Sequence, residues 1–234
     1  MHVSQLKDLL DCAFRFKLYH LDQERTHLPL ARIEDLAHKQ ALKAVLREGL
    51  DHKQHESLLK ALIREKLPTA RRSTRTLAQA MAHAELSVGI FHSTVLKSQM
   101  PPRPWVLDVD YKIAVGDTTV EATIDLLAGK KPIIFQNHFV SQANRRSIMS
   151  SDFEVGMALN YDKSQFVDCV LFSLVGHRCH YLEGSLRSIR KRSLRVAKDA
   201  LNQIKSGAFP RCDPGKFCCT QAWCEFYHEC GKKR

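Results

Sequence analysis

Apolar residues recur every three or four positions through the first hundred residues, a spacing that predicts amphipathic helices. We expect helices over residues 3–21, 28–50 and 51–99, the last with a break near Pro68. A proline-rich stretch at 101–104 ends this region, because proline lacks the backbone N–H that a helix needs. The first hundred residues are therefore predicted to be helical.

The apolar period changes to two after residue 104, which is typical of half-buried strands. Three strands with tight turns between them are expected first, over 105–115, 120–126 and 131–140. A helix, an apolar strand, a short strand and a long basic helix should follow, over 151–160, 166–175, 180–182 and 183–206. This order predicts an α/β fold, a small mixed sheet flanked by helices.

Composition agrees with one integrated folded domain, since 44% of the 234 residues are hydrophobic and 26% are charged. We divide it into a helical region (1–100), a core (101–206) and a cysteine-rich tail (207–234). No apolar run approaches the roughly 20 residues of a membrane span, and the start lacks a signal-peptide pattern. We therefore expect an intracellular protein, in cytoplasm or nucleoid, without a membrane partner.

The charge balance favours a polyanionic partner, nucleic acid first and an anionic membrane second. Lysine and arginine number 36 against 25 acidic residues, a net charge of +11. On the last predicted helix, spacings of three and four align Arg187, Lys191, Arg195 and Lys198. This cationic face is either a solvated surface or a surface that follows nucleic-acid phosphates.

The cysteines are concentrated near the end of the chain, where five of the eight lie in the last 23 residues. Cys219, Cys224 and Cys230 fall within twelve residues, and Cys12 is the candidate fourth ligand. Cys218 is the alternative to Cys219. Four thiolates suit an iron–sulfur cluster, and zinc would accept the same ligands. A disulfide scaffold fits less well, because such scaffolds belong to small secreted chains.

A lone cysteine in an N-terminal helix with three more at the C-terminus resembles the iron–sulfur branch of the PD-(D/E)XK nucleases. These RecB-like exonucleases include the nuclease of CRISPR adaptation and many phage exonucleases. The helix 36–46, the strand 122–125 and the strand 133–138 are similar to the family's motif segments. The resemblance implies a restriction-endonuclease-like core and a 4Fe–4S cluster that joins the two chain ends. It also implies a Mg²⁺ or Mn²⁺ ion on His38 and Asp125, and a DNA substrate.

The catalytic motif of the resembled family is only half preserved. His38 and Asp125 agree with it, but its second acidic residue falls on Gln136 and its lysine on His138. The glutamine of its following helix falls on Glu154. Replacing a carboxylate by a neutral amide removes a full negative charge from the metal shell, so Mg²⁺ affinity should fall.

Three functions remain open from the sequence. The first is a DNA-binding protein with a degraded nuclease site, a subunit of a larger DNA-processing or phage assembly. The second is an active metal-dependent exonuclease with an Asp125…Gln136-x-His138 site. The third is a zinc-stapled interaction module. A further D-x-K pattern at Asp110–Lys112 is interpreted as the polar face of one strand.

Overall fold

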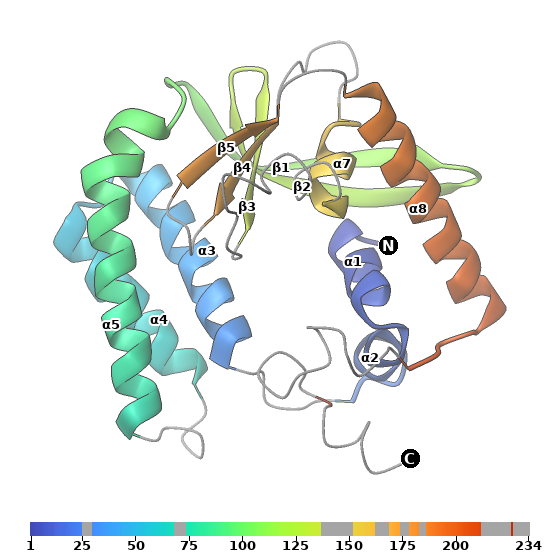
Figure 1. The fold of residues 1–234 in the computed structure, drawn as a ribbon, viewed down its shortest axis with the longest axis horizontal. Helices are drawn as coiled ribbons and strands as arrows, with labels where there is room; N and C mark the ends of the chain where they lie inside the picture. Colours follow the sequence, from blue (N-terminus) through green and yellow to red (C-terminus); the bar gives the residue numbers. More distant parts are fainter. Residues whose placement is uncertain are drawn as a thin grey trace.

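A computed structural model of the chain contains a five-stranded sheet with helices on two sides (Figure 1). It describes residues 1–24, 30–67, 74–136, 152–161, 169–173, 178–182, 186–211 and 226. In the described part of the chain, no helix is both long and apolar enough to cross a membrane. The predicted division into three regions stays a prediction.

The first predicted helix is divided into three short ones, because its backbone becomes extended at Cys12 (φ −158°). These helices are α1 (Val3–Asp11), α2 (Ala13–Phe16) and the π-helix η1 (Lys17–Leu21). The side chain of His2 caps α1 by accepting the Ser4 N–H, and Gln5 accepts the His2 N–H in return.

The next helices confirm the prediction of a helical region up to residue 99. They are α3 (Leu30–Glu48), α4 (His52–Lys66), α5 (Thr74–Ile90) and the π-helix η3 (Phe91–Gln99). Alanines on α3 and α5 pack against larger apolar residues of α4, and the buried members are Ala37, Ala41, Leu59, Ile63, Ala80 and Ala84. Small residues at this contact let the three helices approach closely.

The sheet has the order β1–β2–β3–β4–β5. Its strands are β1 (Trp105–Val115), β2 (Thr118–Ala128), β3 (Lys131–Gln136), β4 (Cys169–Ser173) and β5 (Arg178–Leu182). Neighbouring strands are antiparallel except for the parallel pair β3–β4. The mixed sheet is therefore confirmed. Residues 137–140 of the third predicted strand lie outside the described residues.

Two groups of helices enclose the strands (Figure 1). On one side α3 and η3 cover β3 and one end of β2. Leu42 and Val45 of α3 pack there against Leu126 of β2 and Phe135 of β3. On the other side lie α1, α7 (Phe153–Ala158) and α8 (Arg187–Ser206). They bury the hairpin end of β1 and β2 against residues such as Leu6, Met157 and Leu201. Side chains of α3 therefore reach the middle of the sheet.

Candidate functional site

Asp125 lies on β2, where the sheet and the helix α3 both fix its carboxylate. Its Oδ2 accepts the backbone N–H of Phe135 on β3 at 2.9 Å. Its Oδ1 lies 2.8 Å from Nζ of Lys43 on α3. The side chain is 17% exposed, so these two partners replace most of the water around the carboxylate.

Asp108 is a second carboxylate at the same place. The β1–β2 ladder passes from the pair Leu107–Leu126 to the pair Val109–Ile124, which places Asp108 across from Asp125. Asp108 has a φ of 54°, in the left-handed region that aspartate tolerates better than most residues. Its Oδ1 lies 2.5 Å from Nζ of Lys43, and its Oδ2 accepts from Arg47 at 3.1 Å.

One ammonium group thus joins two aspartates of neighbouring strands, and we call Lys43, Asp108 and Asp125 the aspartate–lysine site. Burial by itself would lower the pKa of Lys43, but Asp125 and Asp108 outweigh burial and raise it. Lys43 therefore stays protonated at neutral pH. Sequence reasoning missed both Lys43 and Asp108, although Lys43 lies next to Leu42 on the buried stripe of its helix.

The predicted divalent-metal ligands His38 and Asp125 stay a prediction, because the structure describes only part of the motif around them. In the described part of the chain, no group of three His, Cys, Asp or Glu side chains is arranged to hold a metal ion. At Asp125 the nearest cation is Lys43, at 2.8 Å. The Lys43 ammonium therefore contacts the same Asp125 oxygen that a Mg²⁺ or Mn²⁺ ion would need as a ligand.

His38 belongs to a group of histidines from three helices. His55 of α4 is 4% exposed, and its Nδ1 lies 3.2 Å from Nε2 of His92 on η3. The ring of His52 lies 5.6 Å from that of His92. Burial and the charges of His92, His38 and His52 lower the pKa of His55 to about 3. At neutral pH His55 is therefore uncharged.

The remaining motif positions are only partly described. Gln136 ends β3, where its backbone pairs with Ser173 of β4, and His138 lies outside the described residues. Their side-chain roles stay a prediction. Glu154, at the position of the family's glutamine, forms an ion pair of 2.5 Å with Lys7 of α1. Glu154 thus links α7 to the N-terminal helix.

The D-x-K pattern on β1 has the contacts of a surface strand. Asp110 accepts a hydrogen bond from the Thr123 hydroxyl at 2.7 Å. Lys112 lies 3.7 Å from Glu121, and both side chains are more than half exposed. These cross-strand pairs confirm the interpretation as a polar strand face.

Of the proposed cluster ligands, only Cys12 lies among the described residues. It is free, 5% exposed, and its Sγ accepts the Arg15 N–H at 3.4 Å. Cys218, Cys219, Cys224 and Cys230 lie outside the described residues. Phe226, between the last two in sequence, is 1% exposed and packs against Leu18 of η1. Part of the tail therefore contacts the segment that follows Cys12.

The cationic face of α8 is exposed as predicted. All four of its predicted members are exposed, namely Arg187, Lys191, Arg195 and Lys198. The opposite side of α8 is buried through Ala197, Ala200 and Leu201. The helix thus presents four positive charges to solvent.

A comparison with known protein families identifies the superfamily to which more than half of the chain belongs. Residues 1–134 match the sequence model of the PD-(D/E)XK nuclease superfamily. The matched region includes His38, Lys43, Asp108 and Asp125, and it ends before Gln136. No curated protein matches the chain.

Replacing Lys43 by methionine should lower the free energy of unfolding by about 2 kcal/mol, because two opposed carboxylates lose their shared cation. The control is Lys39→Met, one turn earlier on α3, where Lys39 forms a helical pair with Asp35 at 3.7 Å among the described residues. That pair contributes about 0.5 kcal/mol or less. Urea unfolding measures both changes, and equal losses would contradict the bridging role of Lys43.

The free energy of unfolding should decrease as the pH falls from 6.5 toward 3. The upper limit is the ordinary pKa of histidine, and the lower limit is the value of about 3 to which burial lowers the pKa of His55. Between these two pH values His55 is protonated in the unfolded chain and unprotonated in the folded chain, so acid favours unfolding. His55→Leu should remove about 2 kcal/mol of the loss between pH 7.5 and 5, as measured by urea unfolding. His83→Leu, at a side chain that is 70% exposed and lies 3.5 Å from Glu34, should remove much less of this loss than His55→Leu does. A His55→Leu curve parallel to that of the wild type would refute the assignment.

Proposed function

The chain belongs to the PD-(D/E)XK nuclease superfamily, and from that premise we propose that it is a DNA-binding protein with a degraded nuclease site. In this proposal it carries a 4Fe–4S cluster and acts as a subunit of a DNA-processing assembly. In this proposal its fold binds DNA, and Asp125, the remaining carboxylate of the family's motif, has a structural role beside Asp108.

The contact of Lys43 with both aspartates carries this proposal. Metal-dependent phosphodiester hydrolysis needs carboxylate oxygens that are available to a divalent cation. Lys43 already compensates Asp125 at 2.8 Å and Asp108 at 2.5 Å, and Arg47 adds a second cation on Asp108. A metal ion would have to displace a lysine whose pKa is raised by these same carboxylates.

The sequence at the next strand supports the same conclusion. The position of the second metal-binding carboxylate is Gln136, which is neutral. The position of the family's lysine is His138, whose imidazole lacks the permanent positive charge of a lysine at neutral pH. Both replacements reduce the charge available for phosphate chemistry, so they agree with a site that binds and does not cleave.

DNA binding is supported by the cationic face of α8. Its four exposed charges extend along three helical turns, or about 16 Å, which is long enough to contact several phosphates. The net charge of +11 gives the whole chain the sign that attracts DNA. We propose a subunit role because a DNA-binding protein without its own nuclease activity would need a partner protein to cleave the DNA.

The cluster is proposed on Cys12, Cys219, Cys224 and Cys230, with Cys218 as the alternative to Cys219. The packing of Phe226 on Leu18 supports it, because Phe226 lies two residues after Cys224. Bound there, the cluster would supply a covalent link between both chain ends. Zinc on the same thiolates is the alternative that metal analysis distinguishes.

The proposal predicts binding without cleavage for protein purified without oxygen. Labelled single- and double-stranded DNA should stay intact with Mg²⁺ or Mn²⁺. Changing Arg187, Lys191, Arg195 and Lys198 to Gln should reduce the slope of log affinity against log salt for duplex DNA by about 3 to 4. Fluorescence anisotropy and gel assays on the same samples measure both results.

The control removes the same number of charges from α4 and β1, by changing Lys53, Arg64, Lys66 and Lys112 to Gln. Its salt slope should be close to that of the wild type. Cleavage that disappears in Asp125→Ala would instead establish an active variant nuclease. Absence of any DNA binding would favour the interaction module.

Cys12→Ser should lose most of the bound iron and acid-labile sulfide, because a three-thiolate site holds a cluster poorly. The matched control is Cys179→Ser on β5, which should keep both. Iron and sulfide analysis of anaerobically purified protein gives the answer. Full iron content in Cys12→Ser would exclude Cys12 as a ligand, and zinc in place of iron would select the alternative metal.

A further inference from the structure

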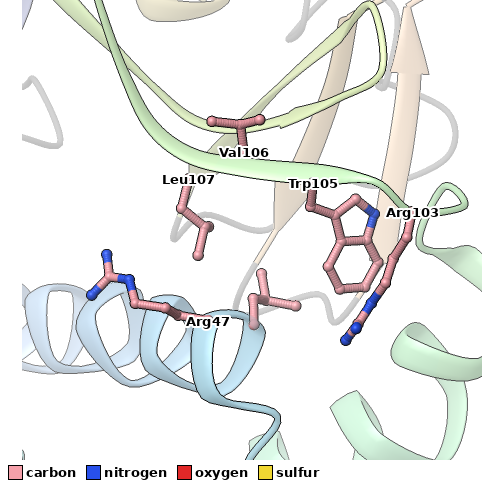
Figure 2. Close-up of a pocket in the computed structure, with 6 residues that line it drawn as sticks. Arg47, Arg103, Trp105, Val106 and Leu107 are labelled. Carbon is pink, nitrogen blue, oxygen red and sulfur yellow. The ribbon is translucent and has the colours of Figure 1, made fainter.

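A pocket of about 420 Å³ lies between the C-terminal half of α3 and the start of β1 (Figure 2). We call it the arginine pocket, and it is lined by Leu46, Arg47, Arg103, Trp105, Val106 and Leu107. Its volume is at the lower end of the range for small-molecule sites. It therefore has room for one nucleotide and not for a duplex.

The pocket has an apolar middle and cationic ends. Figure 2 shows Arg47 and Arg103 at opposite ends, with Leu107 and Trp105 between them on the same side of β1. The indole Nε1–H of Trp105 donates to the Pro101 carbonyl at 3.0 Å, which fixes the ring before any ligand arrives. A fixed aromatic ring loses little entropy when it contacts a ligand.

The two arginines differ in what already holds them. Arg47 donates to Asp108, whose charge Lys43 also compensates, and its side chain is still 59% exposed. Arg103 is exposed, and its guanidinium carbon lies 4.8 Å from the centre of the Trp105 ring. No carboxylate in the described ranges pairs with Arg103. Arg103 is therefore able to accept an anion at no cost in broken ion pairs among these residues.

We propose that the arginine pocket binds one nucleotide of a single DNA strand, with its base against Trp105 and Leu107 and its phosphates at Arg47 and Arg103. Within a strand, each nucleotide has a base with flat apolar faces, and its sugar lies between two phosphates, so one nucleotide can offer a base to the apolar middle of the pocket and phosphates to its two arginines. Guanidinium groups pair with phosphate through charge-assisted hydrogen bonds, and aromatic rings stack on any base. This inference rests on the proposed function and gives it a single-stranded ligand.

The position of the pocket adds to the argument. Arg47 belongs both to the pocket and to the ion pair with Asp108, so the bound nucleotide would lie beside the aspartate–lysine site. The carboxylates there are already compensated by Lys43 and Arg47, which removes the repulsion that two bare aspartates would exert on a phosphate. A strand could thus pass the former catalytic residues without a metal ion.

The test uses a labelled thymidine tetranucleotide with a 5′-phosphate, followed by fluorescence anisotropy. Arg103→Gln should weaken its binding about tenfold, the size of one lost charge-assisted hydrogen bond. Trp105→Ala should weaken it between about five- and a hundredfold. Arg64→Gln, an exposed arginine on α4, should bind like the wild type. The tetranucleotide should also quench the fluorescence of Trp223→Phe, in which Trp105 is the remaining tryptophan, but not that of Trp105→Phe.

The outcomes separate this inference from the proposed function. If Arg103→Gln and Trp105→Ala bind the tetranucleotide with wild-type affinity while duplex binding is intact, the assignment of the pocket as a nucleotide site is wrong. The proposed function is then unaffected. Tetranucleotide binding that depends on Arg103, without duplex binding, would support the pocket and contradict the role of α8. Full competition by inorganic phosphate at the tetranucleotide concentration would show a general anion site and overturn the assignment of a nucleotide.

Discussion

The ammonium group of Lys43 is the interaction on which the middle of this structure depends. Asp108 and Asp125 lie across from each other on neighbouring strands, where two like charges would repel and separate the strands. Lys43 contacts both carboxylates and so turns the repulsion into a bridge between β1, β2 and α3. The packing of Leu42 and Val45 on the sheet sets the height and rotation of α3 that this bridge requires.

The same bridge is the basis of the proposed function. Carboxylates that a lysine and an arginine compensate are poor ligands for a divalent ion, yet they are good structural partners. The α/β scaffold, the cationic α8 and the cysteine pattern do not depend on these carboxylates. In the proposed function, loss of catalysis would therefore leave the proposed DNA binding and the proposed cluster unaffected.

Much of the fold could be predicted from the sequence, because helix and strand periods are local properties. The strand from Trp105 to Val115 and the long α8 needed only the spacing of apolar residues. The break at Cys12 was not predicted, since the apolar spacing continues across it while the backbone becomes extended. Asp125 became a candidate through resemblance. Its partner Lys43 lies 82 positions away, and only the packing of α3 on the sheet brings the two together.

Asp108 shows why the rest could not be predicted. Strict alternation places it on the exposed face, and it does lie there, but its ion pairs with Lys43 and Arg47 depend on how α3 packs beside β1. Arg47 also lines the pocket to which Arg103 and Trp105 contribute. Because the aspartate–lysine site is compensated and Arg103 is not paired with a described carboxylate, an approaching phosphate meets a net positive potential at the pocket. Arg47 therefore links the aspartate–lysine site to the pocket where we propose that a DNA strand binds.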